Sequence, residues 1–434
     1  GLTMARKMKD SGIEWIGEIP EGWEVAKLKN IVSIVRGGSP RPIEAYMSDN
    51  DNDVNWIRIS DTEKGSKYIT HTSRKLIASG ISKSRFIKRG SLILTNSMSF
   101  GEPYILDIDG CIHDGWVAFS DFKKIDKEFL YYFLTSPLAK IQFEQQVDGG
   151  VVKNLNIDKI GDTVILLPSL IDQNKVIAHL DSLTSETNSL LSKTITSIEE
   201  YKKLKQAVIT QAVTKGVRGE REMKDSGVEW IGEIPEEWNK CKLKNISIDI
   251  GDGLHGTPKF DDSGEVYFIN GNNFSSEYVE PKFDTKKLCL EESLNYPKPE
   301  LTEQTIMISL NGSYGKVCLY RYFPMLLGKS AGYITLLPSI NRRYVRYYLS
   351  STPAQTIMTL SLNGTTIPNL SLYTLYNFPT ILPSASEQAE IADYLDAKCA
   401  EIDGLIAKKE QLVKELESYK KSLIYEVVTG KREV

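Results

Sequence analysis

The chain has 434 residues, of which 41% are hydrophobic and 25% are charged, and its formal net charge is −4. This length exceeds one ordinary core and predicts two or more domains, while the absence of a long apolar run or a basic-then-apolar leader predicts a cytoplasmic protein without a membrane span. Five scattered cysteines without a CxxC pair and four dispersed histidines favour free thiols and predict no metal site.

The chain opens with a segment that it later repeats. MKDSGIEWIGEIPEGWEVAKLKNI at residues 8–31 and MKDSGVEWIGEIPEEWNKCKLKNI at residues 223–246 agree at 19 of 24 positions without a gap. The interval between their first residues, which we call the repeat offset, also relates LPSLIDQ at residues 167–173 to LPSASEQ at residues 382–388. The whole protein is therefore interpreted as one unit duplicated in tandem, which suggests a pseudo-twofold molecule.

A compact α+β domain is predicted after each opening segment. Short runs rich in β-formers alternate with Gly, Asn, Ser and Pro turns, and one short helix interrupts them in each copy. The clearest runs are VNWIRIS (54–60), SLILTNS (91–97), TIMISLN (305–311) and GYITLLP (332–338). The flanks of the two copies agree while their interiors hardly align, so one frame is expected to carry two different faces.

Each copy ends in a predicted long helix. Ser169 and Ser384 suit the N-cap, with Asp172 and Glu387 three residues later in the capping-box position. About 45 helical residues give a rod of roughly 65–70 Å. A narrow apolar stripe follows each cap: Leu180, Leu183, Leu190, Ile198 and Leu204 in the first helix, and Leu395, Ile402, Leu405, Leu412 and Leu416 in the second. Such a stripe favours one partner helix, here the other copy running antiparallel, with two separate helical hairpins as the alternative.

The predicted fold class is α+β, with two globular α/β domains separated by two long antiparallel helices that form a coiled-coil spacer in a pseudo-twofold tandem repeat. The expected boundaries are 1–24 and 217–240 for the repeated segments, 25–166 and 241–381 for the globular domains, and 167–216 and 382–434 for the helices.

Two long stretches without acidic residues point to a nucleic-acid partner despite the negative net charge. Residues 64–101 and 304–386 contain Lys and Arg but no Asp or Glu. Positive surfaces of this kind attract and orient phosphates. The alternative is a chance excess on ordinary solvated loops.

No motif encodes a catalyst. GDGLHG at residues 251–256 matches G-x-G-x-x-G, but Pro258 and Gly264 oppose the helix that a dinucleotide site needs. GKS at residues 328–330 resembles the end of a P-loop, yet Phe323 occupies the position of the first glycine. His113 and Asp114 are interpreted as turn residues, so the chain is predicted to have no catalytic and no metal site.

These motifs together resemble the specificity subunits of type I restriction–modification enzymes, over essentially the whole chain. The resemblance rests on two G-x-E-W-I-G-E-I-P-x-x-W segments (12–23 and 227–238) and the two L-P-S-x-x-x-Q helix starts. DGLHGTPKF…FINGNNF (252–274) and SLNGSYGKV (309–317) also look like target-recognition domains of that family. The first copy has RGGSPRP (36–42) in place of DGLHGTP, so the two domains are expected to belong to different subtypes.

The resemblance implies a DNA-recognition subunit that is not itself an enzyme. Two domains would each read a few base pairs of double-stranded DNA, so the target would be bipartite and asymmetric, with a gap set by the helices. Two modification subunits would bring S-adenosylmethionine, and restriction subunits would bring ATP and Mg. No cofactor is expected in this chain. A self-sufficient modification enzyme and a scaffold that binds no DNA are the alternatives.

The candidate DNA-binding residues come from the acid-free stretches and from Gly/Asn loops. Asn pairs bidentately with adenine and Arg with guanine, whereas Lys mainly holds phosphate. The first domain contributes Arg36, Ser39, Arg41, Arg58, Ser60, Arg74, Lys75, Asn96 and Ser99. The second contributes His255, Thr257, Lys259, Asn270, Asn272, Asn273, Asn311, Ser313 and Lys316.

Overall fold

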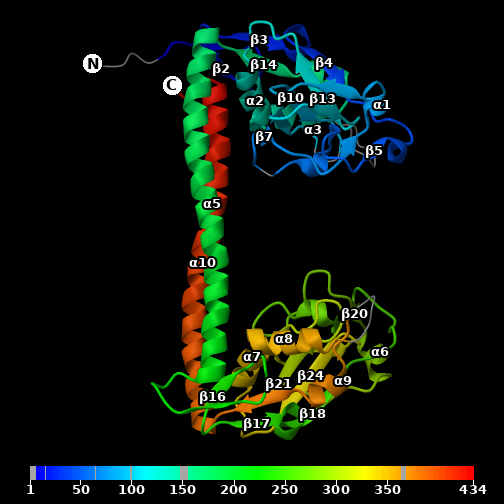
Figure 1. Ribbon diagram of the computed structural model, residues 1–434, viewed down its shortest axis with the longest axis vertical. Coiled ribbons are helices and arrows are strands. Elements are labelled where there is room, and N and C mark those ends of the chain that lie inside the picture. Colours follow the sequence, from blue (N-terminus) through cyan, green and yellow to red (C-terminus); the bar gives the residue numbers. More distant parts are fainter. Residues whose placement is uncertain (1–5, 15, 64, 98–99, 147–154, 363–367) are drawn as a thin grey trace. The chain divides into compact units, whose positions relative to one another are not determined.

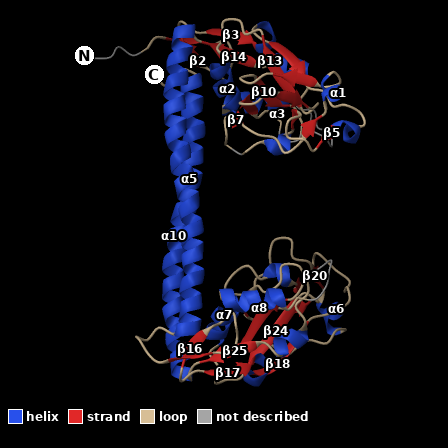
Figure 2. Ribbon diagram, in the orientation of Figure 1, coloured by secondary structure: helices blue, strands red, loops and turns tan. Residues whose placement is uncertain are grey.

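A computed structural model describes residues 6–14, 16–63, 65–97, 100–146, 155–362 and 368–434. The first compact unit comprises Gly1–Ile195 with Glu410–Val434, and the second comprises Thr196–Lys409. Each unit combines a globular part with a stretch of two long helices, α5 (Leu170–Lys215) and α10 (Ala385–Val428) (Figure 1). Both globular parts mix helices and strands, which confirms the predicted α+β class (Figure 2). No described helix is long and apolar enough to cross a lipid bilayer.

Two five-stranded sheets build the globular part of the first unit. The first sheet has the order β4-β13-β10-β11-β7 and contains β4 (Ser33–Arg36), β13 (Trp116–Ser120), β10 (Leu92–Thr95), β11 (Pro103–Leu106) and β7 (Tyr68–Ile69). The second has the order β5-β8-β6-β12-β9 and contains β5 (Met47–Ser48), β8 (Lys75–Leu76), β6 (Val54–Ile57), β12 (Gly110–Ile112) and β9 (Arg85–Ile87). Smaller pairs join β1 (Met8–Asp10) to β2 (Glu18–Pro20) and β3 (Glu24–Lys27) to β14 (Val164–Leu167).

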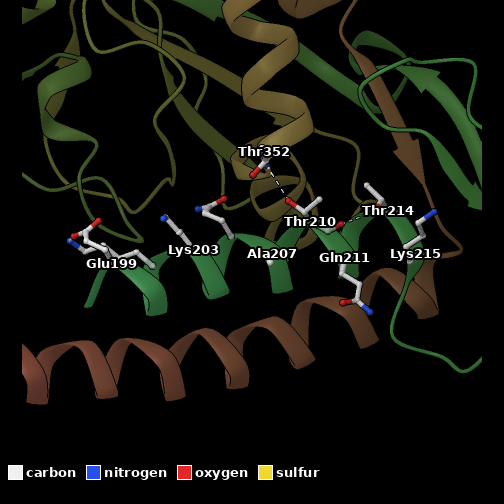
Figure 3. Close-up of a pocket in the computed structure, with 10 residues that line it drawn as sticks. Glu199, Lys203, Ala207, Thr210, Gln211, Thr214, Lys215 and Thr352 are labelled. Carbon is white, nitrogen blue, oxygen red and sulfur yellow. Dashed lines mark hydrogen bonds and ion pairs between the residues drawn. The ribbon is translucent and has the colours of Figure 1, made fainter. Parts of the chain in front are cut away.

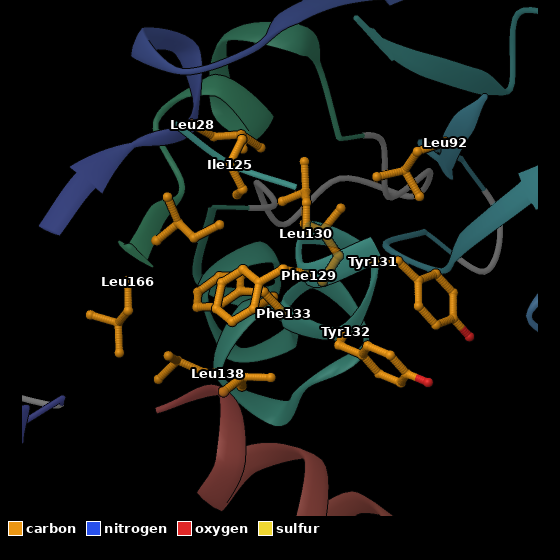
Figure 4. Close-up of a cluster of buried hydrophobic side chains, with 14 of the residues drawn as sticks. Leu28, Leu92, Ile125, Phe129, Leu130, Tyr131, Tyr132, Phe133, Leu138 and Leu166 are labelled. Atoms are coloured by element: carbon orange, nitrogen blue, oxygen red, sulfur yellow. The ribbon is translucent and has the colours of Figure 1, made fainter. Parts of the chain in front are cut away.

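The first sheet separates two hydrophobic cores. Side chains alternate across a strand, so Leu92 and Leu94 of β10 face one core while Ile93 faces the other. The first core contains Phe129 and Phe133 of α2 (Lys127–Thr135), which lie close together in Figure 4. The second core lies between the two sheets. The helices α1 (Ala78–Ile81), α3 (Pro137–Gln146) and α4 (Ile157–Gly161) complete the unit.

The second unit repeats this plan with shorter sheets. One sheet has the order β18-β24-β21-β22, from β18 (Ser247–Asp252), β24 (Ala331–Leu336), β21 (Thr305–Ser309) and β22 (Val317–Leu319). The other has the order β20-β19-β23, from β20 (Lys287–Leu288), β19 (Val266–Ile269) and β23 (Met325–Leu327). Further pairs join β15 (Met223–Asp225) to β16 (Glu233–Pro235) and β17 (Asn239–Lys242) to β25 (Pro379–Leu382). Its helices are α6 (Leu290–Leu294), α7 (Arg342–Ser350), α8 (Thr352–Leu360) and α9 (Leu372–Tyr376).

Both long helices begin at the predicted caps. The Ser169 hydroxyl accepts a hydrogen bond from the Asp172 N–H at 3.2 Å, and the Ser384 hydroxyl accepts one from the Glu387 N–H at 3.3 Å. These bonds satisfy N–H groups that the first helical turn leaves unpaired.

Within each unit, α5 and α10 run antiparallel. In the second unit, Lys205 of α5 lies 2.6 Å from Asp403 of α10, and the Lys409 ammonium of α10 lies 5.6 Å from the ring centroid of Tyr201 of α5. Residue numbers therefore rise along α10 in the direction in which they fall along α5. In the first unit, Lys420 donates to the Asn188 side chain at 2.8 Å. Lys420 is the counterpart of Lys205 at the repeat offset, and Asn188 is the counterpart of Asp403. The tandem repeat therefore extends to individual contacts.

The structure corrects the predicted stripe. Leu180, Ile198, Leu395 and Ile402 are buried, and Leu183, Leu405 and Leu416 are half-buried. Three predicted members of the stripe are exposed instead: Leu190 (52%), Leu204 (47%) and Leu412 (42%). They do not fill the contact between the two long helices, which we call the seam.

Threonines replace the missing leucines in the first unit. Thr184, Thr187 and Thr194 are buried, and each hydroxyl donates to the backbone carbonyl four residues earlier at 2.5–2.7 Å. The Thr184 hydroxyl also lies 3.2 Å from that of Tyr132 in α2, so Thr184 contacts the globular part of the unit. For Thr187 and Thr194 the bond within the helix satisfies the hydroxyl and allows the side chain to be buried. An apolar-residue pattern overlooks such positions.

A matched pair of truncations tests this seam. Leu395→Ala removes a fully buried side chain and should lower the free energy of unfolding by about 2–5 kcal/mol. Leu412→Ala, at an exposed position on the same helix, should change it by less than about 0.5 kcal/mol. Urea denaturation followed by circular dichroism measures both. Equal losses would mean that Leu412 is also part of the seam.

Candidate nucleic-acid interface

In each unit, several loops meet around one turn at an edge of the sheets. In the first unit this turn, residues 113–115, joins β12 to β13, and we call it the first hub turn. Residues 328–330 join β23 to β24 at the corresponding place of the repeat and form the second hub turn. The C-terminal ends of several strands lie at each turn, so the loops that follow them are brought together.

Three loops bond to the first hub turn or its flanks through their backbones. The loop after β4 reaches it through Gly38, whose N–H donates to the carbonyl of Ile112 at 3.0 Å. The loop after β6 reaches it through the Ile59 N–H, which lies 3.3 Å from His113 Nε2. The loop after β10 reaches it through the Asn96 N–H, which donates to the Gly115 carbonyl at 2.9 Å.

The second hub turn gathers the corresponding loops. The Leu254 N–H after β18 donates to the carbonyl of Leu327 at 2.7 Å. After β19, the Gly271 N–H donates to the hydroxyl of Ser330 at 3.0 Å, and after β21 the Leu310 N–H donates to the Ser330 carbonyl at 3.0 Å. The GKS sequence that resembles the end of a P-loop is thus the structural centre of this edge.

A glycine allows the first loop to approach each hub turn. A Cβ atom on Gly37 would lie 2.0 Å from the His113 carbonyl oxygen, and one on Gly253 would lie 2.3 Å from the Leu327 carbonyl. Both obstacles are backbone atoms, so any larger residue would push the loop away from the edge.

Arginines give the first edge its positive charge. The Arg36 Nε–H donates to the Asp114 carbonyl at 3.0 Å, and the exposed Arg41 guanidinium lies 3.7 Å from the Asp114 carboxylate. Arg85, at the start of β9, points its Nε–H toward the Arg36 carbonyl at 3.4 Å. Only Arg41 faces the Asp114 carboxylate, while Arg36 and Arg85 bond to backbone carbonyls, so this edge carries more positive than negative charge for phosphate or guanine.

Asp114 organises these groups. The Ser39 hydroxyl donates to its carboxylate at 2.5 Å, and this bond, followed by smaller effects that include Arg41, lowers the pKa of Asp114. The carboxylate therefore stays ionised at neutral pH and holds the loop after β4 against the first hub turn.

Arg58 lies in a more buried polar cluster beside the same turn. Its guanidinium donates to the Ser73 hydroxyl at 2.5 Å and lies 3.6 Å from Asp61. Burial alone would raise the pKa of Asp61, but hydrogen bonds from Ser73 and from the Arg58 backbone lower it overall. Burial also lowers the pKa of His113, which favours its neutral form at pH 7. Arg58 thus stabilises the edge as well as facing it.

The other first-unit candidates differ in accessibility. Ser60 and Arg74 are exposed, whereas Lys75 donates to the Asn55 side chain at 2.7 Å. Asn96 is only 2% exposed, so in this conformation its side chain cannot reach a duplex. Its backbone instead connects β10 to the hub turn. Ser99 lies outside the described residues.

The second-unit candidates fall into two groups. Thr257, Lys259, Asn272, Ser313 and Lys316 are exposed, and so is His255, whose Nε2 lies 2.7 Å from Asp252. The second group is held by the loop itself: the Asn270 side-chain Oδ1 accepts from the Ser330 hydroxyl at 2.9 Å, and the half-buried Asn311 forms an isolated bridge with Asn369. Asn273 is 2% exposed and donates to Thr285 at 2.8 Å, so burial argues against a direct base contact.

Three residues at these edges are absent from the sequence-based candidates. They are Asp114, Arg85 and the exposed Lys329 in the middle of the second hub turn. Arg85 and Lys329 lie in the acid-free stretches, which was the available signal. Asp114 carries no such signal, because only the fold places it beside Ser39.

Neither a metal centre nor an enzymatic pocket emerges from the described part of the chain. It holds no group of three or more His, Cys, Asp and Glu side chains that could bind a metal ion. A groove of about 920 Å³ runs along α5 in the second unit, between Lys203, Thr210 and Thr352 (Figure 3). Lys, Thr and Gln side chains dominate its wall, and the Glu199 carboxylate that also lines it is paired with Lys202 at 2.9 Å.

Comparisons with known proteins agree with this arrangement. Residues 20–200 and 235–415 each match the type I restriction modification DNA specificity domain, and the two matches are related by the repeat offset. The specificity subunit of the type I restriction enzyme MjaVIII from Methanocaldococcus jannaschii is 26% identical over 95% of this chain and 93% of its own length. That of EcoBI from Escherichia coli is 22% identical over 93% and 85%.

Solved structures resemble the fold. A chain from a study of complex assembly and conformational transition of the type I R-M system has a TM-score of 0.73 and 17% identity, over 95% of this chain and 99% of that one. The HsdS subunit from Thermoanaerobacter tengcongensis has a TM-score of 0.50 and 17% identity, over 95% and 98%.

The Asp61 cluster predicts an acid-dependent loss of stability. The pKa of Asp61 in the folded chain lies below its usual value of 3.8. Ionised Asp61 therefore stabilises the fold at pH values above 3.8, and this stabilisation is lost as the pH falls through the folded-state pKa. Asp61→Asn should lower the free energy of unfolding by about 1–3 kcal/mol at pH 7 and by less at pH 3. Ser73→Ala should act in the same direction with a smaller effect. Parallel curves for wild type and variant between pH 7 and pH 3 would contradict this role.

Proposed function

The chain belongs to the family of type I restriction–modification DNA specificity proteins, and from that premise we propose that it reads a bipartite, asymmetric DNA target with one half-site per unit. The observation that carries this proposal is the pair of hub turns. The same frame gathers three loops in each unit, but the exposed side chains on those loops differ. Two different surfaces on one repeated frame suit two different half-sites.

In the first unit we propose that Arg36, Arg41 and Arg85 face the DNA, with Ser39, Arg58, Ser60 and Arg74 around them. In the second unit the proposed contacts are Lys329 and the exposed residues His255, Thr257, Lys259, Asn272, Ser313 and Lys316. Arginine and asparagine provide the bidentate donors and acceptors that distinguish bases in the major groove, while the lysines bind phosphates.

The remaining segments would support these contacts. We propose that residues 25–166 and 241–381 are the target-recognition domains, and that residues 1–24 and 217–240 are frame segments between each domain and the helices. The chain is the DNA-recognition subunit and not the catalyst of its complex. Methylation of the host genome, mapped by sequencing, should reveal a split target with unlike halves.

The long helices are the proposed docking surface for protein partners. Leu190, Leu204 and Leu412 are large apolar side chains exposed on them, and the groove in Figure 3 lies along α5. We propose that two modification subunits dock here and bring S-adenosylmethionine, and that restriction subunits bring ATP and Mg. The complex would act in the cytoplasm.

Removing one arginine tests the first edge. Arg41→Ala should weaken binding of the complex with modification subunits by about 1–3 kcal/mol and relax one base position if Arg41 reads a guanine. Arg89→Ala is the matched control, because Arg89 follows the far end of β9 and pairs with Asp107 at 2.7 Å. Fluorescence anisotropy with a set of target variants measures both. Equal effects of the two variants would place the DNA elsewhere.

A lysine in the second unit should behave differently. Lys316→Ala should weaken binding to all sequences alike and lower the slope of log K against log salt concentration by about 1, because it removes one phosphate contact. The same anisotropy experiment at several salt concentrations provides the slope. A selective loss at one base position would instead identify Lys316 as a base-reading residue.

The helix length should set the gap between the half-sites. The helices have 46 and 44 residues. Deleting seven residues from each, at facing positions, preserves the seven-residue seam and removes about 10 Å, or about three base pairs. Methylome sequencing should then show a shorter gap between unchanged half-sites. Changed half-sites with an unchanged gap would refute this model.

A further inference from the structure

One aromatic side chain of the second unit is fully exposed. The exposed area of Phe283 is 109% of that of a reference phenylalanine, more than for any other large hydrophobic side chain that the structure describes. It belongs to the segment that leads into β20, PKFDTKKL at residues 281–288. A single exposed apolar residue on ordinary surface needs no explanation, so the position of this ring decides what it means.

Strand pairing places Phe283 at the edge that the second hub turn organises. β20 runs antiparallel to β19, and the Phe268 N–H donates to the Lys286 carbonyl at 2.8 Å. The residues before Lys286 therefore continue past the C-terminal end of β19, because antiparallel strands enter and leave at opposite ends. The loop that reaches the second hub turn begins at that same end of β19.

Phe283 is at the tip of a turn that two hydrogen bonds close. The Thr285 N–H donates to the Lys282 carbonyl at 3.1 Å, and the Lys282 N–H donates to the Thr285 hydroxyl at 2.7 Å. The buried Asn273 side chain donates to that hydroxyl at 2.8 Å and accepts from the Asn270 N–H at 3.0 Å. Asn273 therefore fixes the turn to the loop after β19.

The first unit has the same support for a different tip residue. Asp61 accepts from the Arg58 N–H at 2.9 Å and from the Ser73 hydroxyl at 2.5 Å, across the 12 residues that also separate the supporting pair of the second unit. The exposed His71 takes the place of Phe283, two residues before the hydroxyl side chain. A retained support with a changed tip is expected of a position that differs between two half-sites.

The tip offers an apolar ring and little net charge. Lys282 and Asp284 flank Phe283 with opposite charges, and Glu280, which precedes the turn, lies 3.5 Å from Arg321. Phosphate binding therefore does not account for the ring. Among the base edges of the major groove, the group that suits an apolar side chain is the methyl group of thymine.

We propose that Phe283 contacts the methyl group of one thymine in the half-site of the second unit and determines specificity at that position. This assignment rests on the proposed function and deepens it, because it connects one side chain with one base. The other base contacts of this unit are polar, so the methyl group is recognised by Phe283.

Deoxyuridine isolates this contact, because it lacks the methyl group of thymidine and keeps the same hydrogen-bonding groups. The complex of the full chain with its modification subunits is titrated by fluorescence anisotropy with target duplexes in which each thymine of either strand is replaced in turn. At one position the replacement should weaken binding about fourfold, the factor that corresponds to burial of one methyl-sized group. A target without thymine, or one in which no replacement weakens binding, would overturn the proposal.

Variants of the ring assign the methyl contact to Phe283. Phe283→Ala should bind the thymine and deoxyuridine duplexes equally at that position, and Phe283→Leu should keep part of the preference. Tyr322→Ala is the matched control and should keep the full preference. Tyr322 is also aromatic and 82% exposed, but it lies in the loop before β23, at the opposite end of that strand from the second hub turn. A preference that survives in Phe283→Ala, or that both alanine variants lose equally, would contradict the assignment.

The same titrations separate this contact from the proposed function. If the proposed function is wrong, the wild-type complex binds its target no better than unrelated DNA. If only the assignment of Phe283 is wrong, target preference is intact and does not depend on a thymine methyl group through this ring. Sedimentation of the complex tests the remaining possibility: weaker assembly of Phe283→Ala with modification subunits would place the ring in a protein interface and refute the DNA contact.

Discussion

A buried glutamine at the start of each long helix is the constraint on which both units depend. Gln173 accepts a hydrogen bond from the Asp126 N–H at 2.7 Å and donates to the Pro168 carbonyl at 3.0 Å. Gln388 repeats both bonds in the second unit, at 2.9 and 3.0 Å. Asp126 is the N-cap of α2, so this side chain fixes the start of the long helix to the start of a short core helix. Losing it would leave buried amide groups unpaired, which is why the motif occurs in both copies.

One position near the start of the short core helix carries opposite charges in the two units, Glu128 in the first and Arg343 in the second. In the first unit, Lys67 lies 2.6 Å from Glu128 and 2.7 Å from Asp181. In the second unit Arg343 replaces Glu128 in the repeat and pairs directly with Asp396, the counterpart of Asp181. Each long helix thus presents a counterpart carboxylate to the globular part of its own unit, and each globular part supplies its own cation. The interior sequences are free to diverge as long as this pairing is kept.

The two units differ in side-chain chemistry at the hub turns and beside the shared start of the long helices. The first edge is organised by an aspartate and arginines, whereas the second is built from asparagine, serine and lysine on glycine-rich loops. Near the helix starts, Glu387 accepts from the Trp238 indole N–H, whereas the Trp23 indole N–H has no acceptor among the described residues of the first unit. Both differences lie in side chains, whereas backbone N–H groups hold three loops to the hub turn or its flanks in each unit.

The sequence alone determined the tandem repeat, the α+β class, the family resemblance and the caps at Ser169 and Ser384, because these depend on local pattern or on long identical segments. The tertiary structure decided which helix faces are buried: Leu190 and Leu412 are exposed, while Thr187 is buried with its hydroxyl bonded to its own helix. It also decided which polar residues reach the surface, since Asn96 and Asn273 carry suitable amides but are buried, and strand order alone brings Asp114 to Ser39. Burial and long-range proximity are properties of packed neighbours, which periodicity along one chain does not specify.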